Sequence, residues 1–165
     1  MTQVDIAIIS DTHMPRGRRR LPDACVRRCA AADLLVHAGD FVDVGTLELL
    51  RGLGPPLVAV HGNVDDLAVC DALPAERVVQ VAGAQIAVLH DAGPAHGRLA
   101  RMRHRFPQAD VVVFGHSHLP LHEHEGAFQL FNPGSPTERR GAAHHTMGTA
   151  RVIDGAVTLD LVVLD

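Results

Sequence analysis

Five short apolar runs, each followed closely by a side chain that can bind a metal ion, constrain the fold of this chain more than any other feature. The runs cover residues 4–9, 34–36, 57–60, 85–89 and 111–114. They are short and rich in β-branched residues, so they predict buried strands rather than helices. The polar side chains that follow the runs are, in chain order, Asp11, His13, Asp40, Asn63, His90, His116 and His118. Ligands bind at the carboxyl ends of strands in open α/β sheets, so we expect these seven side chains to meet there.

The segments around these runs predict the remaining elements. Helical spacing of apolar residues predicts helices over residues 22–32, 46–53 and 96–106. Strands that alternate with helices favour a mainly parallel arrangement in the first half of the chain. In the second half, turn signals at Ala82-Gly83 and Asp154-Gly155 predict hairpins over 78–89 and 151–164, with a further strand over 127–131.

Together these elements predict an α/β fold in which two mixed β-sheets pack as a sandwich and helices flank them. The chain has 165 residues, a length typical of one domain, and no linker or internal repeat divides it. We therefore expect a single domain over residues 1–165.

Composition excludes several classes of partner and compartment. The net charge of −4 gives no general attraction to nucleic acid or to anionic membranes. The chain shows no signal-peptide pattern and no apolar run near the ~20 residues of a membrane span. Cys25, Cys29 and Cys70 cannot form a closed disulfide framework and favour a reducing compartment. We expect a cytoplasmic protein without a membrane partner, and the sequence leaves a homo-oligomer open.

The candidate ligands suit a pair of divalent cations. His116 and His118 are separated by one residue, so in an extended backbone both rings would project to the same side. Imidazole nitrogens of this kind bind Zn, Mn, Fe or Ni, although a lone pair of histidines in a solvated loop would look the same. Two dications about 3.5–4 Å apart need an anionic oxygen between them. Asp40, which follows Gly39, is the natural bridge, and the remaining positive charge would attract a phosphoryl group.

Five short blocks carry a resemblance to a known family. They are Asp11-Thr12-His13, Gly39-Asp40, Gly62-Asn63-Val64-Asp65, His90 and Gly115-His116-Ser117-His118. In this order they resemble the signature blocks of the calcineurin-like metallophosphoesterases. The short length and the segment Asn132-Pro133-Gly134-Ser135 look like the small YfcE-like phosphodiesterase branch. The resemblance spans residues 4–140.

The resemblance implies a dinuclear metal-dependent phosphoesterase, in the first place a phosphodiesterase, that acts on a small phosphate ester. A metal-bridging hydroxide would attack phosphorus in line, and Asp40, Asn63 and His116 would act through the metals. One metal would take Asp11, His13, Asp40 and His118, and the other would take Asp40, Asn63, His90 and His116. Manganese is the expected metal, with zinc, iron and nickel as alternatives.

The sequence departs from the family at two positions. Many members have a histidine at position 64 that protonates the leaving group, and the YfcE-like branch often has cysteine. Val64 cannot donate a proton, so we predict a preference for good leaving groups, or a proton from water or a neighbouring histidine. At position 91 relatives commonly have glycine; Asp91 could orient a ligand histidine from behind or face water. His61 and Asp65, beside the asparagine, could touch substrate or hold the loop.

Other polar groups keep two interpretations. Arg16, Arg18, Arg19 and Arg20 could guide an anionic substrate or keep a loop solvated. Ser135 or Arg139 could contact phosphate. His122 and His124 alternate with acidic residues in a segment that reads as a strand or a turn, and they indicate a solvated face.

A different class of protein also fits the predicted fold. Retromer scaffold subunits have a similar fold, bind partner proteins and have lost ligand residues. Here all seven ligand positions are filled, which favours catalysis over a scaffold role.

Overall fold

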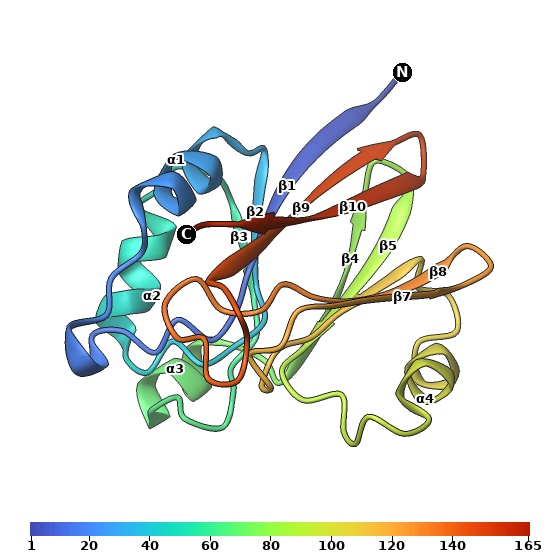
Figure 1. The fold of residues 1–165 in the computed structure, drawn as a ribbon. Helices are drawn as coiled ribbons and strands as arrows, with labels where there is room; N and C mark the ends of the chain where they lie inside the picture. Colours follow the sequence, from blue (N-terminus) through green and yellow to red (C-terminus); the bar gives the residue numbers. More distant parts are fainter.

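The computed structural model describes residues 1–165 and contains two five-stranded sheets that pack face to face (Figure 1). The strand order of the first sheet is β10-β9-β1-β2-β3, and that of the second is β4-β5-β6-β8-β7. The first sheet consists of β1 (Gln3–Ile9), β2 (Leu34–His37), β3 (Leu57–Ala59), β9 (Thr146–Ile153) and β10 (Ala156–Val163). The second consists of β4 (Glu76–Val81), β5 (Ala84–Leu89), β6 (Val111–Val113), β7 (Leu121–Glu125) and β8 (Phe128–Asn132).

Both sheets are mixed, as the sequence predicted. In the first sheet β1, β2 and β3 run parallel, while β9 and β10 form an antiparallel hairpin that pairs with β1. In the second sheet β5, β6 and β8 run parallel. Strand β4 pairs antiparallel with β5, and β7 pairs antiparallel with β8. The turns at Ala82-Gly83 and Asp154-Gly155 have the positive φ values that a tight hairpin requires.

Alternation along the strands builds two layers of core. Ile6 and Ile8 of β1 point between the sheets, where they join Val88 and Val113 of the second sheet in one buried cluster. The alternate residues of β1 face outward, against α1 (Asp23–Ala31) and α2 (Val44–Arg51). On the other side, α4 (Arg98–Arg105) covers the second sheet through Met102. Helices therefore flank the sandwich on both outer faces (Figure 1).

The sequence does not predict two of the observed elements, and for a third it does not distinguish a strand from a turn. Helix α3 (Leu67–Ala72) has only six residues, too few for a helical repeat to show, and it begins where the Asp66 side chain accepts the Val69 N–H. The 3-10 helix η1 (Arg16–Arg18) is a single turn. Strand β7 lies at the edge of its sheet with four of its five residues exposed, so its sequence lacks an apolar alternation. No helix in the structure has the length and apolar character that crossing a membrane requires.

Candidate metal centre

The loops that follow β1, β2, β3, β5 and β6 converge and bring all seven predicted side chains together. Ligand atoms form two groups, within each of which they lie no more than 4.8 Å apart: Asp11, His13 and His118 in one, and Asp40, His90 and His116 in the other. Asn63 joins the second group, because its Oδ1 lies 2.9 Å from His90 Nε2 and 3.0 Å from His116 Nδ1. Each group contains residues that follow strands of both sheets.

Asp40 connects the two groups through one oxygen. Its Oδ2 lies 3.2 Å from Nε2 of His13, in the first group, and 3.1 Å from Nε2 of His90, in the second. Its other oxygen, Oδ1, accepts the backbone N–H of Val64 at 3.0 Å, which fixes the orientation of the carboxylate. A single carboxylate oxygen is thus placed between two sets of ligand atoms.

Most of these side chains extend from strained backbone. Five of the seven residues have the positive φ of the left-handed region: Asp11 at 57°, His13 at 46°, Asp40 at 67°, His116 at 72° and His118 at 62°. This conformation costs an L-residue other than glycine about 1–2 kcal/mol, and it is concentrated at functional sites. The strain lets the chain leave each strand abruptly with its side chain turned into the centre.

The same backbone corrects one prediction. Extended backbone at His116 and His118 would have put both rings on the same side, and that prediction is wrong. With φ values of 72° and 62° the two residues turn toward different groups. His118 is fully buried beside Asp11, whereas 44% of the His116 side chain is exposed next to Asn63.

Glycines leave room for this close approach. A Cβ atom at Gly39 would lie 2.8 Å from His90 Nδ1, and one at Gly115 would lie 2.6 Å from Asp11 Oδ2. Both distances are shorter than real Cβ atoms show. The Gly-Asp and Gly-His pairs seen in the sequence therefore have a steric cause as well as a chemical one.

The hydrogen bonds of the histidines show that the centre fits cations. His90 Nδ1 donates to the Ala38 carbonyl at 2.8 Å, so its Nε2 carries a lone pair that faces Asp40 Oδ2. His118 Nδ1 donates to the Glu138 carbonyl at 2.8 Å, and its buried Nε2 has no hydrogen-bond partner and lies 3.5 Å from Asp11 Oδ1. Lone pairs and carboxylate oxygens, all acceptors, thus face one another in a buried space. A divalent cation between them would satisfy them all.

The electrostatics of the carboxylates agree with this. Burial raises the pKa of Asp11 to about 6, although His90 and Ser10 oppose the shift. Burial also acts to raise the pKa of Asp40, but the adjacent Nε2 atoms of His13 and His90, when they carry a proton instead of facing a cation, hydrogen-bond to it, and the pKa falls below its usual range. Burial acts to lower the pKa of His90, yet Asp40 and Asp11 raise it. The two carboxylates together make a centre that favours positive charge.

Asp65 holds the loop rather than facing the centre. Its carboxylate accepts three backbone N–H groups, from Gly62 at 2.7 Å, Val42 at 2.8 Å and Asp40 at 3.0 Å. These bonds tie the loop after β3 to the loop after β2. The sequence allows Asp65 either to touch substrate or to hold the loop, and in the structure it holds the loop.

His61 and Asp91 line a cavity of about 320 Å³ together with Asn63 and His90. Asp91 Oδ2 lies 4.0 Å from His116 Nε2, which is beyond hydrogen-bond distance, and 59% of its side chain is exposed. Asp91 therefore faces water beside the second group.

The segment 132–140 lies against the first group. Ser135 is buried, and its Oγ donates to the Asp11 carbonyl at 2.8 Å. Arg139 donates to the Ala143 carbonyl. Of the arginine cluster, Arg19 pairs with Glu138 at 3.0 Å. Glu138 also lies 3.2 Å from His13 Nδ1, a contact for which the sequence gave no signal.

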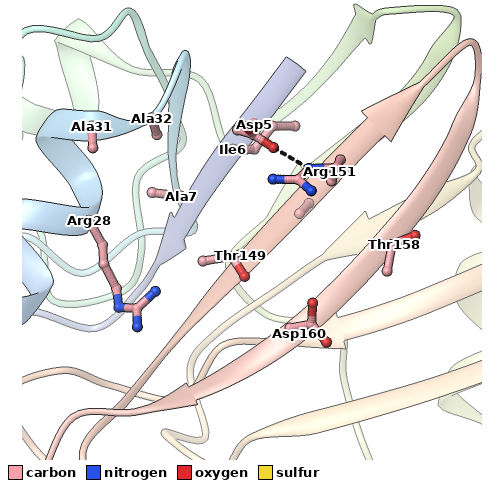
Figure 2. A pocket seen from close by; sticks show the side chains of 11 residues that line it. Asp5, Ile6, Ala7, Arg28, Ala31, Ala32, Thr149, Arg151, Thr158 and Asp160 are labelled. Carbon is pink, nitrogen blue, oxygen red and sulfur yellow. Dashed lines mark hydrogen bonds and ion pairs between the residues drawn. The ribbon is translucent and has the colours of Figure 1, made fainter. Parts of the chain in front are cut away.

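The largest surface cavity lies elsewhere. It measures about 510 Å³ and opens on the outer face of the first sheet, where α1 ends and β9 and β10 continue (Figure 2). Asp5 and Arg151, which form an ion pair at 2.8 Å, line it together with Arg28 of α1 (Figure 2). None of the seven candidate ligands lines it, so volume does not locate the chemistry in this molecule.

Relatives by sequence include proteins from archaea and bacteria. A probable metallophosphoesterase of Methanocaldococcus jannaschii is 35% identical over 138 residues, covering 82% of this chain and 69% of its own. A probable metallophosphoesterase of Methanothermobacter thermautotrophicus is 31% identical, covering 82% of this chain and 78% of its own.

Solved structures share the whole fold. A Vps29 mutant of Entamoeba histolytica superposes with a TM-score of 0.78 at 19% identity, over 98% of this chain and 99% of that one. A predicted phosphoesterase of Streptococcus pneumoniae gives a TM-score of 0.72 at 22% identity, over 100% of this chain and 92% of that one. The family described as the calcineurin-like phosphoesterase superfamily domain matches residues 4–155. This match and the identity to the archaeal relatives show that the chain belongs to the calcineurin-like phosphoesterase superfamily.

Proposed function

We propose that this protein is a dinuclear metal-dependent phosphodiesterase. The observation that carries the proposal is the position of Asp40 Oδ2, 3.2 Å from His13 Nε2 and 3.1 Å from His90 Nε2. Two dications held close together need such an anionic oxygen between them. Family membership supports a hydrolase that acts on phosphate esters.

We assign the ligands from the two groups. One cation would be held by Asp11, His13, Asp40 and His118, and the other by Asp40, Asn63, His90 and His116. This mixture of carboxylate, amide and imidazole donors suits manganese first, and also zinc, iron or nickel. A Vps29 of Entamoeba histolytica was solved as a zinc complex, which supports zinc as an alternative for this fold.

When bound, the two cations would supply activation of water and charge neutralisation at the phosphoryl group. The chain itself orients the centre. Two carboxylates, Asp11 and Asp40, offset only half of the charge of two dications, so an anionic phosphoryl group is attracted. His116, partly exposed, and Asn63 lie at the open side, where the cavity of about 320 Å³ can receive a small ester. The polar residues that line it, including His61 and Arg105, favour a polar leaving group.

We further propose that the protein acts in the cytoplasm on a small phosphate ester, without a membrane partner or general binding of nucleic acid. Three free cysteines support a reducing compartment. The Sγ atoms of Cys25 and Cys29 lie 4.0 Å apart in the core and pack as small apolar groups.

Hydrolysis of bis(p-nitrophenyl) phosphate tests the proposal. We expect turnover with added Mn²⁺, none after chelation, and a loss of at least about 100-fold in kcat/KM for His116→Ala, because a misplaced ion costs this much. Glu125→Gln, which removes an exposed charge paired with Arg103 far from the centre, is the matched control and should keep its rate. Absence of metal-dependent turnover in the wild type would contradict the proposal.

A scaffold role is the second candidate, because several neighbours of the same fold are Vps29 proteins. It predicts a protein that hydrolyses neither diesters nor monoesters with any of the four metals. The seven filled ligand positions favour catalysis, because a surface used only for partner binding gives no reason for buried acceptors to face one another.

A further inference from the structure

Glu138 contacts the back of the first ligand group from the loop between β8 and β9. Its Oε2 lies 3.2 Å from His13 Nδ1 and 3.8 Å from His118 Nδ1. This oxygen is buried and has no hydrogen bond of regular geometry. The backbone carbonyl of the same residue accepts from His118 Nδ1 at 2.8 Å. One residue therefore faces the Nδ1 side of both imidazoles in the group.

The position of Glu138 is fixed by the ligand loop itself. Its N–H donates to Ser135 Oγ at 2.9 Å, and Ser135 Oγ donates in turn to the Asp11 carbonyl at 2.8 Å. Thr137 Oγ1 donates to the Thr12 carbonyl at 2.6 Å. These bonds lock the loop onto Asp11 and Thr12, the two residues that precede His13, so the backbone of Glu138 keeps its position relative to the ligand loop.

A carboxylate in this place has two effects on a bound cation. A proton on His13 Nδ1 is attracted to it, which directs the lone pair of Nε2 toward Asp40 and raises the basicity of the ring. The buried negative charge also lies one imidazole away from the cation. Partners of this kind change metal affinity by about 10- to 100-fold in other metal sites.

The second group lacks an equivalent carboxylate. His90 Nδ1 donates to a neutral backbone carbonyl, that of Ala38. Apart from the candidate ligands Asp11 and Asp40, the acidic side chain near His116 is that of Asp91, which lies 4.0 Å away and is mostly exposed, so water screens it. His13 and His118 are buried, whereas 44% of the His116 side chain is exposed.

We propose that Glu138 is a positioning residue that makes the site of Asp11, His13 and His118 the tighter of the two cation sites. Arg19, whose Nη2 lies 3.0 Å from Glu138 Oε1, moderates this effect by offsetting part of the negative charge. This inference rests on the dinuclear centre proposed above, and it adds that the two cation sites differ in affinity. The first site keeps its ion, and the more exposed second site exchanges it.

Calorimetric titration of the metal-free protein with Mn²⁺ tests the inference without measuring activity. We expect two binding steps of unequal affinity in the wild type. Glu138→Gln, which keeps shape and removes charge, should weaken the tighter step by about 10- to 100-fold and leave the weaker step within about twofold. Glu125→Gln, the same charge change at a remote exposed site, should leave both steps unchanged.

Arg19→Gln separates positioning from a merely structural role. Removal of the opposing charge should tighten the first step a few-fold, whereas general damage to the loop would weaken it. This variant also keeps the test decisive if Glu138→Gln does not fold, which circular dichroism would show.

The outcomes separate the two proposals. If the wild type binds no Mn²⁺, Zn²⁺, Fe²⁺ or Ni²⁺, the dinuclear centre itself fails. If the wild type binds two ions but the steps are equal, or if Glu138→Gln changes neither step or both alike, only the role of Glu138 is overturned. If Glu138→Gln cannot be measured, the Arg19→Gln variant decides. The role of Glu138 is then overturned if the affinity of the tighter binding step is unchanged or lower in Arg19→Gln.

Discussion

Val64 lies beside the carboxylate that joins the two ligand groups, yet only its backbone takes part in the hydrogen-bond network. Its N–H donates to Asp40 Oδ1 at 3.0 Å, and its aliphatic side chain cannot deliver a proton. The Val64 backbone thus supports the geometry of the centre, but the Val64 side chain cannot protonate the leaving group.

Substitution of Val64 by histidine should supply that acid. We expect Val64→His to raise kcat on alkyl phosphodiesters, by a factor of up to about 10²–10⁴, and to change the rate on p-nitrophenyl diesters little, because p-nitrophenolate leaves without a proton. Steady-state kinetics on both ester classes measure the effect. Val64→Ala is the control, because its side chain also cannot donate a proton. If Val64→His folds and its alkyl-ester rate does not rise, lack of an acid does not limit the reaction.

Asp65 contributes through the loop that it holds. Removal of its carboxylate would leave three backbone N–H groups without their acceptor. We expect Asp65→Ala to lower the free energy of unfolding by about 2–4 kcal/mol, since a bond to a charged acceptor is worth about 1.5–3 kcal/mol and a lost partner costs more. Urea unfolding of the metal-free protein measures it. Asp71→Ala, an exposed acidic residue nearby, should change stability by less than about 0.5 kcal/mol.

At the scale of elements, the centre depends on how strands end. Gly115 is the second residue after the buried strand β6, and a Cβ there would lie 2.6 Å from Asp11 Oδ2. The loop after β6 therefore packs directly onto the loop after β1, and each loop sets the position of the other.

Gly115→Ala should separate these loops. We expect a loss of at least about 100-fold in kcat/KM, because a displacement near 1 Å of a ligand loop has this consequence, together with weaker Mn²⁺ binding. Gly141→Ala is a suitable comparison, because a Cβ there would meet nothing closer than 4.0 Å. Equal behaviour of the two variants in kinetics and calorimetry would show that this contact is not needed.

The elements also show what the sequence could reveal. Short apolar runs and turn pairs predicted nine of the ten strands, because each of these strands contributes buried apolar residues to the core. The polar edge strand β7 and the six-residue α3 carry no such signal. The candidate ligands were found because each follows a run. The resemblance placed His116 and His118 on different metals, but their positive φ values were not foreseen, because left-handed backbone at histidine leaves no mark in composition.

The residues that contact the candidate ligands without facing the centre were the hardest to predict. Asp65 could be placed near Asn63 by sequence distance, but its role was open. Glu138 lies 125 residues from His13 along the chain, and only folding brings the two together. Such long-range pairing cannot be deduced from one sequence.

At the scale of the whole molecule, the centre lies across the junction of the two sheets. Asp11, Asp40 and Asn63 follow strands of the first sheet, whereas His90, His116 and His118 follow strands of the second. A cation in either group would therefore be bound by both layers of the sandwich at once, and only the folded state provides both.

Metal addition should accordingly stabilise the fold. At a free Mn²⁺ concentration 100 times the dissociation constant, binding at one site adds about 2.7 kcal/mol. For a chain of this length we expect the melting temperature to rise by about 5–10 °C over the chelated sample. Differential scanning calorimetry measures the shift, which Asp40→Asn should greatly reduce and Glu125→Gln should preserve. A melting temperature that does not respond to any of the four metals would contradict binding across the layers.

The left-handed backbone at five ligand residues has a consequence for how this protein matures in the cell. Loops that are costly to form and lined by mutually repelling acceptors gain little from closing before an ion arrives. A newly made chain would then complete its sandwich core first and close its ligand loops last, when an ion is captured. The ion available at that moment, rather than the one bound most tightly at equilibrium, would decide which metal the buried first site keeps, whereas the more exposed second site would exchange its ion.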